Sequence, residues 1–376
     1  MKCFEKIVRN ILVEHTKDIL DPLQFAYQPN RSVEDAIGYL LHTVCKHLER
    51  TGTYVRVFFV DFSSAFNTIV PGTLVKKLSS VVNPKLCQWL RDFMTNRVQQ
   101  VRFGNVMSQA RRLSTGTPQG CVLSPILYTL LTSDFSCSTA SSCHVVKYAD
   151  DTCFIGLITN NDEVAYRDTV DNFVSWSEEN SLVLNATKSH EMIFDYRKNG
   201  GTNNVPLYID GKAIQQVAEC KYLGVVIDNK LKWDSNTKVI LSKGNQRMSL
   251  LRKMKALHVK SDTMFLFYQC VIQSVICFCC LAWFNSLSGK NRAKLNRIVK
   301  HASRVIGVSV KELEDVAERA LLAKLQVIVK DSNHPLHNEV VFNRSGRIRL
   351  PRIRTDRFGR SFLPSAMKVF NNNFCR

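Results

Sequence analysis

The fold is decided by Tyr148-Ala149-Asp150-Asp151, which lies between two apolar runs at residues 144–147 and 152–158. Two strands joined by a tight turn would place both carboxylates at the tip of a hairpin. Adjacent aspartates at such a tip repel each other unless a cation binds there, and a divalent cation that prefers oxygen ligands suits them. Because aspartate is also common in turns, a plain turn is the alternative interpretation.

A third aspartate occupies a matching position. Residues 54–60 are rich in β-branched and aromatic side chains and end at Asp61, so they predict a buried strand with a carboxylate at its C-terminal end. Beside an acidic hairpin, Asp61 would complete a site for two magnesium ions, which can clamp the attacking and leaving oxygens of a phosphoryl transfer. The alternative is that Asp61 caps a helix that starts at Phe62.

Between these acids lies a loop of small residues, at positions 113–120, that leads into an apolar segment with helical spacing from about Cys121. Gly120 would let the backbone approach a flat ligand closely, and Gln119 could reach a template strand. A plain helix start with proline in its first turn explains the same residues equally well.

The order of three motifs, at residues 61–66, 116–120 and 148–151, resembles the reverse transcriptases of non-LTR (LINE-type) retrotransposons. Residues 25–32 resemble the finger motif of that family, and residues 221–228 resemble its primer grip. The resemblance implies an α+β right-hand polymerase with partial fingers, a palm built on an antiparallel sheet, a helical thumb and a basic C-terminal extension. The implied domains are fingers and palm at 1–235, thumb at 236–305 and extension at 306–376.

The resemblance also implies roles for individual residues. Asp61, Asp150 and Asp151 would be catalytic and would bind two Mg²⁺ ions, or Mn²⁺ in their place, together with the backbone carbonyl of Phe62. The ring of Phe66 would lie under the incoming sugar and leave no room for a 2′-hydroxyl, so that deoxynucleoside triphosphates are preferred; ordinary core packing is the alternative.

Further roles follow from the same resemblance. Lys188 would protonate the departing pyrophosphate, although a solvated lysine without a role is the alternative. The remaining implied contacts are with substrate, by Arg31, Gln119 and Gly120, and with nucleic acid, by Tyr222, Leu223, Gly224, Arg252, Lys253 and Lys255.

The first residues of the chain, 1–8, resemble the middle of the family's first finger segment. The upstream basic residues that hold a triphosphate, and an endonuclease domain, are therefore expected to be absent, which puts turnover in doubt. Three functions are considered: an RNA-directed DNA polymerase, a catalytically impaired nucleic-acid-binding remnant of such an element, and a two-metal nuclease. Phe66 and Gln119 argue against the nuclease, which needs neither residue.

The charge of the chain agrees with an RNA template and a DNA primer as partners. Lys and Arg total 51 against 32 for Asp and Glu, which gives a net charge of +19 and a pI near 9.5. Residues 238–304 contain 13 Lys and Arg with Asp262 as their single acid, and residues 341–376 contain nine with Asp356. Charge runs on solvated helices normally mix both signs, so these runs favour a polyanionic partner.

Thirteen cysteines, an odd number in a long chain, predict reduced thiols in an intracellular protein. The expected location is nuclear with a cytoplasmic ribonucleoprotein stage, and the oligomeric state stays open. Residues 264–284 approach membrane-spanning length, but Gln269 and Gln273 share one helical face, so a buried thumb helix is expected and no membrane partner. His334 and His337 are expected in a surface loop.

The periodicity predicts helices, hairpins and one strand beyond the acidic motifs. The predicted helices span residues 33–48, 71–80, 84–95 and 162–180. The other predicted elements are hairpins around residues 98–105 and 207–214, and a strand at 222–227.

Overall fold

The computed structural model of the chain describes residues 2–137, 142–198 and 205–373. Its contacts divide the chain into two compact units. The first unit comprises residues 1–31, 56–191 and 202–216, and the second comprises residues 32–55, 192–201 and 217–376. The predicted three-domain division stays a prediction, because compactness alone does not define a functional domain.

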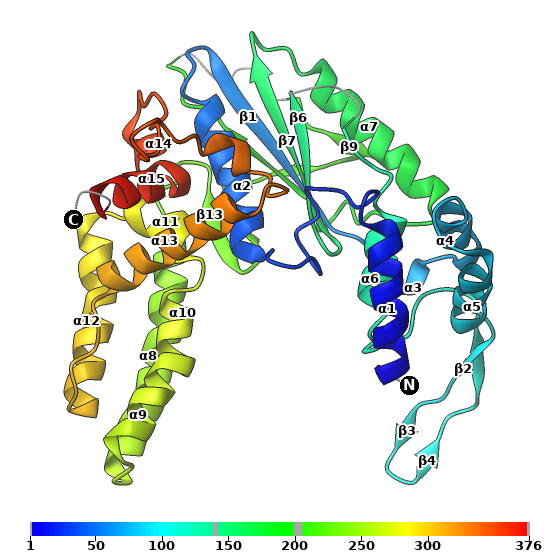
Figure 1. Cartoon of the computed structure of the whole chain (residues 1–376), viewed down its shortest axis with the longest axis horizontal. Coiled ribbons are helices and arrows are strands. Elements are labelled where there is room, and N and C mark those ends of the chain that lie inside the picture. Colours follow the sequence, from blue (N-terminus) through cyan, green and yellow to red (C-terminus); the bar gives the residue numbers. More distant parts are fainter. Residues whose placement is uncertain (1, 138–141, 199–204, 374–376) are drawn as a thin grey trace. The chain divides into compact units, whose positions relative to one another are not determined.

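A five-stranded sheet in the order β11, β8, β1, β7, β6 forms the framework for the acidic residues. Strand β1 (Thr53–Val60) is buried along its whole length. Strand β6 (Cys143–Tyr148) pairs antiparallel with β7 (Asp151–Thr159), and helix α7 (Val164–Glu179) packs against this hairpin (Figure 1). The hairpin expected around the paired aspartates is therefore present, and the mixed helices and sheet confirm the α+β class.

The other elements of the first unit surround this sheet or extend from it. Its helices are α1 (Lys2–Thr16), α3 (Ala65–Thr68), α4 (Pro71–Leu78), α5 (Pro84–Met94) and α6 (Ser124–Leu131). Its remaining strands are β2 (Arg97–Gln99), β3 (Arg102–Phe103), β4 (Val106–Met107), β5 (Arg111–Leu113), β9 (Tyr208–Ile209), β10 (Lys212–Ala213) and β11 (Gln215–Gln216). Strand β8 (His190–Phe194) begins in the first unit and continues into the second.

A buried ionic cluster joins three parts of the first unit. The guanidinium of Arg56, on β1, is fully buried and donates to both carboxylate oxygens of Glu191 on β8, at 2.8 and 2.6 Å. It also donates to both oxygens of Glu163, at 2.7 Å, at the start of α7. The hydroxyl of Tyr166 adds a bond of 2.8 Å to Glu191. These bonds satisfy charges that would otherwise be costly inside the protein.

Two groups of helices make up most of the second unit. Helix α8 (Asp234–Ala256) packs along α12 (Gly289–Ile306) and α10 (Ser274–Ile276) (Figure 1). The close approach requires a glycine: a Cβ at Gly244 would lie 2.8 Å from Cδ1 of Ile298. A larger residue at position 244 would therefore require Ile298 to shift.

The second group lies around α2 (Val33–His47), which α11, α14 and α15 contact (Figure 1). The remaining elements of this unit, in chain order, are β12 (Glu219–Tyr222), β13 (Val225–Asp228), α9 (Ser261–Phe267), η1 (Tyr268–Gln273), α11 (Cys280–Trp283), η2 (Phe284–Ser286), α13 (Leu313–Lys330), η3 (His337–Glu339), α14 (Asp356–Gly359) and α15 (Phe362–Asn373).

The prediction of a surface loop position for His334 is wrong. Its side chain is fully buried, with Nε2 3.1 Å from Oδ1 of Asp35, and its Nδ1 accepts from the backbone of Leu336. Lys324 donates to the other oxygen of Asp35 at 2.8 Å. Although burial opposes it, these bonds hold the pKa of Asp35 down to about 2.

The predicted helices at 33–48, 71–80, 84–95 and 162–180 are present as α2, α4, α5 and α7, within two residues at each end. Three other predictions need correction. Helix α6 begins at Ser124 rather than at Cys121, because Pro125 has no amide hydrogen to donate and fits only the first turn. Residues 222–227 are two strands of a hairpin rather than one, since Leu223 and Gly224 form its turn with φ of 46° and 87°.

The third correction concerns residues 264–284, which do not form one helix. Helix α9 continues through the π-helical η1 into α10, which ends at Ile276, and Cys279 has a φ of 51°. In the part of the chain described, no single helix is long and apolar enough to cross a membrane. One bent pair, Ser261–Ile276 with Cys280–Ser286, passes that test by length and composition.

Candidate active site

Asp61 is held at the end of β1 by a turn at residues 185–189. Its amide donates to the hydroxyl of Ser189 at 3.1 Å, and its carbonyl accepts from the amide of Asn185 at 2.8 Å. Ser189 is itself fully buried and donates to the carbonyl of Asn185. Hydrogen bonds at both its amide and its carbonyl therefore hold the backbone of Asp61 in place.

The same pairing orients the carbonyl of Phe62. Phe62 faces Leu184 across an isolated antiparallel bridge whose hydrogen bonds come from the residues on either side of it. Successive carbonyls of a strand point to opposite edges. Because the carbonyl of Asp61 points toward Asn185, that of Phe62 is directed to the opposite edge, where a ligand could meet it.

Asp150 and Asp151 lie at the tip of the β6–β7 hairpin. The register pairs Tyr148 with Asp151, so Ala149 and Asp150 form a two-residue turn. Ala149 has a φ of 57°, which side-chain-bearing residues seldom adopt. The amide of Ala149 donates to Oε1 of the buried Gln24 at 3.1 Å, which stabilises this strained turn.

The three carboxylates share one electrostatic environment. The pKa of Asp151 is raised to about 6, first by burial and then by the negative charges of Asp150 and Asp61. The buried hydroxyl of Tyr128 feels the same charges: its pKa is raised by burial and then by Asp150 and Asp151. That hydroxyl has no hydrogen-bond partner among the residues described. The negative charges of Asp61, Asp150 and Asp151 thus lie close enough to influence one another and Tyr128.

This arrangement fits a divalent cation by its chemistry. Carboxylate and carbonyl oxygens are the ligands that hard cations prefer, and a bound cation would relieve the repulsion that raises the pKa of Asp151. Within the described ranges, no three His, Cys, Asp or Glu side chains converge closely enough to hold a metal ion. The carboxylates of Asp61, Asp150 and Asp151 therefore do not close around one point in this structure, although the charges of Asp150 and Asp61 reach Asp151.

Phe66 follows Asp61 by five residues and packs against Tyr128. It belongs to the short helix α3, is partly exposed, and its ring centroid is 4.8 Å from that of Tyr128. Tyr128, by contrast, is 1% exposed. One face of the Phe66 ring is thus supported by a buried residue that also faces Asp150 and Asp151.

The loop of residues 115–120 packs directly on α3. The amide of Thr117 donates to the carbonyl of Phe66 at 3.0 Å, and Nε2 of Gln119 lies 3.3 Å from Oδ1 of Asn67. Gly116 has a φ of 77°, and a Cβ there would lie 2.8 Å from the backbone of Asn67. Gln119 and Gly120 are exposed at the end of this loop.

Arg97 fixes the other side of the same loop. One guanidinium nitrogen, Nη2, donates to the carbonyls of Thr115 and Gly116 at 2.7 and 2.8 Å. Its Nε donates to the carbonyl of Met94 at the end of α5. Sequence reasoning missed Arg97, because nothing in the spacing of a surface arginine indicates that it binds loop carbonyls.

For two of the predicted residues, Lys188 and Arg31, the contacts described here are those of the backbone. Lys188 is exposed, and its amide bonds with Asn185 in the turn that holds Asp61. Arg31 is half-buried, and its amide closes a turn on the carbonyl of Gln28. The roles given to Lys188 and Arg31 stay predictions.

The remaining predicted contacts belong to the second unit. Tyr222, Leu223 and Gly224 form the end and turn of the β12–β13 hairpin, where a Cβ on Gly224 would come within 3.1 Å of the ring of Phe278. The predicted basic residues Arg252, Lys253 and Lys255 are exposed near the C-terminal end of α8.

Sequence reasoning also missed Gln24, Tyr128 and Ser189. Ser189 directly follows Lys188, and Tyr128 falls in the apolar segment after the loop, so both lay close to predicted residues. Their roles depend on hydrogen bonds and ring contacts between distant parts of the chain, which periodicity does not reveal.

A strand-end carboxylate, an acidic hairpin and an aromatic ring beside a glycine loop make up the candidate site. The chain belongs to the reverse transcriptase (RNA-dependent DNA polymerase) family, which matches residues 1–227. Enzymes of this family generally use divalent metal ions. The expected α+β right-hand architecture is that of this family.

The relatives of the chain are proteins of mobile elements. A probable RNA-directed DNA polymerase from transposon BS of Drosophila melanogaster is 25% identical over 264 residues, which are 67% of this chain and 29% of that protein. The RNA-directed DNA polymerase from mobile element jockey of Drosophila funebris is 25% identical over 240 residues, 61% of this chain and 26% of that protein. The predicted resemblance to LINE-type reverse transcriptases is confirmed.

The chain spans less than a third of the length of these two relatives. Among solved structures, telomerase from Candida tropicalis in complex with a fragment of telomeric RNA is similar, with 13% identity and a TM-score of 0.46. That match covers 86% of this chain and 54% of the telomerase chain.

Proposed function

We propose that the chain catalyses RNA-directed DNA synthesis, adding deoxynucleotides from dNTPs to the 3′-hydroxyl of a DNA primer on an RNA template. The observation that carries this proposal is the position of Asp61 at the end of β1 and of Asp150 and Asp151 at the tip of the β6–β7 hairpin; burial first, and then the charges of Asp150 and Asp61, raise the pKa of Asp151. Neighbouring ionised carboxylates repel one another, and bound cations offset that repulsion.

Two Mg²⁺ ions, or Mn²⁺, would be held by the three carboxylates and the carbonyl of Phe62, and would supply stabilisation of negative charge on the transferring phosphoryl group. Ser189 and Gln24 keep the ligands in place through the backbones of Asp61 and Ala149. These two bonds restrain the backbone at Asp61 and at the turn that carries Asp150.

The other residues act on the nucleotide and the template. The ring of Phe66, supported by Tyr128, excludes a sugar with a 2′-hydroxyl. Gln119 and Gly120, exposed on a loop fixed by Arg97, contact the template base. The part given to Lys188 is protonation of the pyrophosphate oxygen, which suits an exposed ammonium group close in sequence to the turn that holds Asp61.

The proposal also covers the cellular location of the chain and its binding partners. The chain works with an RNA template, a DNA primer and dNTPs, in the nucleus with a cytoplasmic ribonucleoprotein stage. Support for the nucleic-acid partners comes from the family match and from the net charge of +19.

Primer extension on an RNA template with the purified chain tests this proposal. With Mg²⁺ and dNTPs, the wild type should extend a DNA primer, and Asp150→Asn should lose extension by at least 100-fold, roughly the loss expected when transition-state charge is left unstabilised. Binding of the template and primer, measured by fluorescence anisotropy, should stay within about twofold, because few backbone contacts are lost.

Asp168→Asn is the matched control, since it removes the same charge from an exposed position on α7 in the same unit. This control should extend primers at the wild-type rate. Wild-type extension by Asp150→Asn would show that the site is wrong. A wild-type chain that binds template and primer but adds no nucleotide with either metal ion would refute the activity.

A further inference from the structure

A pocket in the second unit has no part in the proposed polymerase site. It has a volume of about 550 Å³ and opens to solvent between the start of α12 and the α14–α15 segment. That volume lies in the range of small-ligand sites, and it is many times that of one water molecule. Its lining residues are Asn285, Leu287, Gly289, Arg292, Gly359, Arg360, Ser365, Lys368 and Val369.

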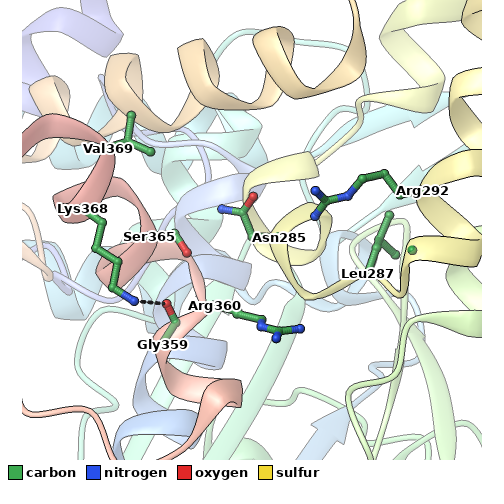
Figure 2. A pocket seen from close by; sticks show the side chains of 9 residues that line it. Asn285, Leu287, Arg292, Gly359, Arg360, Ser365, Lys368 and Val369 are labelled. Carbon is green, nitrogen blue, oxygen red and sulfur yellow. Dashed lines mark hydrogen bonds between the residues drawn. The ribbon is translucent and has the colours of Figure 1, made fainter. Parts of the chain in front are cut away.

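The lining carries three cations and no acid. Figure 2 shows Arg292, Arg360 and Lys368 projecting from α12, from the end of α14 and from α15. Two of the three are held in place. The guanidinium of Arg292 lies 5.0 Å from the ring centroid of Phe284, and Lys368 donates to the carbonyl of Gly359 at 3.2 Å. The pocket therefore concentrates positive charge on groups that still have hydrogens to donate.

Acidic side chains near the pocket neutralise this charge only weakly. Asp356 lies 3.2 Å from Arg360, but the side chains are 89% and 58% exposed, and such exposed pairs stabilise little. Glu314 lies 3.9 Å from Nε of Arg292, beyond hydrogen-bonding distance. An anion with several oxygens could replace or share both contacts.

We propose that this pocket binds the phosphate backbone of single-stranded nucleic acid. Phosphate groups match the three cations, and arginine in particular binds phosphate oxygens in pairs. Asn285 and Ser365 offer donors and acceptors for a sugar or base edge, and Leu287 supplies apolar surface. A pocket of this volume takes a nucleotide together with its phosphate. A duplex, whose bases are paired and stacked, cannot insert a whole nucleotide, so the ligand is a single strand.

Gly289 offers a sharp test, because it lines the pocket at the first residue of α12. A Cβ built there meets no atom within 4 Å, and its φ lies outside the left-handed region. An aspartate at this position would place a carboxylate at the pocket wall. A negative charge at the start of a helix also stabilises that helix by about 0.3–1 kcal/mol. The Gly289→Asp variant is therefore expected to fold.

The measurement is anisotropy of a labelled oligouridylate of about ten nucleotides with the whole chain in EDTA, so that catalysis plays no part. Gly289→Asp should weaken binding by about fivefold or more at 0.1 M salt, the contribution of one phosphate contact at a slope of about 0.7 per contact. Gly289→Ala, the matched control without charge, should bind like the wild type. Equal binding by Gly289→Asp and Gly289→Ala would overturn the proposal.

A second pair of variants tests the cations. Arg360→Gln with Lys368→Gln should weaken binding about 25-fold at 0.1 M salt and lower the salt slope by about 1.4, the values for two contacts to a single strand. Arg344→Gln with Arg352→Gln removes two exposed charges from the same basic region, outside the pocket, and should have a smaller effect. Equal losses in both pairs would assign binding to net charge alone and overturn the site.

The form of the ligand is tested in the same assay. Uridine monophosphate should compete with the oligomer only in large excess, since it offers one phosphate group where the oligomer offers several. Competition by the monophosphate at concentrations similar to those of the oligomer would mark a mononucleotide site and refute the backbone proposal. An equal loss of duplex binding on Gly289→Asp would refute the preference for a single strand.

Discussion

Arg56→Met should destabilise the first unit by about 3–5 kcal/mol, the cost of leaving one member of a buried ion pair without its partner. Glu191 would then be a fully buried carboxylate whose remaining bonds come from the hydroxyl of Tyr166 and, at 3.2 Å, from the amide of Gln216. Neither group carries a charge. Glu191→Met should cost less, about 2–3 kcal/mol, because Arg56 keeps both bonds to Glu163.

The double variant Arg56→Met with Glu191→Met should cost no more than Glu191→Met alone, since both buried charges are removed and Glu163 keeps Arg167. The expected coupling is therefore at least about 3 kcal/mol, the full cost of Arg56→Met alone. Urea unfolding, followed by hydrogen exchange of the β7 amides, measures it in the unit concerned. Arg167→Met, which removes a more exposed arginine from the same cluster, should cost about 1 kcal/mol or less. Additive losses within about 0.5 kcal/mol would refute the reasoning.

Phe66→Ala should lower the preference for dNTPs over ribonucleotides by roughly 10- to 100-fold in single-nucleotide addition, because the ring that excludes the 2′-hydroxyl is gone; unchanged discrimination would place Phe66 in a packing role. Changing Arg252, Lys253 and Lys255 to Gln should lower the salt slope of duplex binding by about 2.7 and shorten extension products, whereas an unchanged slope would mark a solvated surface. The raised pKa of Asp151 means that the folded protein holds this proton more tightly than the unfolded chain between pH 3.8 and about 6. Without divalent ions, the stability that this proton contributes is present at low pH and is lost as the pH rises through 6. Relative to Asp151→Asn, the urea midpoint of the wild type should therefore fall over that interval, and parallel pH profiles would contradict the assignment.

The parts of the fold that could be predicted were those specified by local sequence. The acidic hairpin follows from two apolar runs around a short turn, and helices α4 and α5 follow from proline at the start of a periodic segment. The three acids could be proposed as a site because each stands at the end of a predicted strand. The effect of Asp150 and Asp61 on the pKa of Asp151 agrees with that hypothesis.

The parts that could not be predicted depend on partners distant in the chain. His334 looked like a loop residue because its neighbours are polar, but it binds Asp35, which is 299 positions away. Arg56 interrupts an apolar strand, and only the fold shows that Glu191 and Glu163 surround it. Contacts of this kind leave no periodic pattern, so a single sequence contains no signal for them.

The packing of Gly116 against Asn67 has a consequence for any attempt to engineer this site. The loop that carries Gln119 and the helix that carries Phe66 touch at backbone distance and share a hydrogen bond, so they move as one body. A change that widens the space beneath the sugar will therefore displace the surface offered to the template. Tolerance for altered sugars and accuracy of copying should change together, and restoring one without the other will require a compensating substitution at their common boundary.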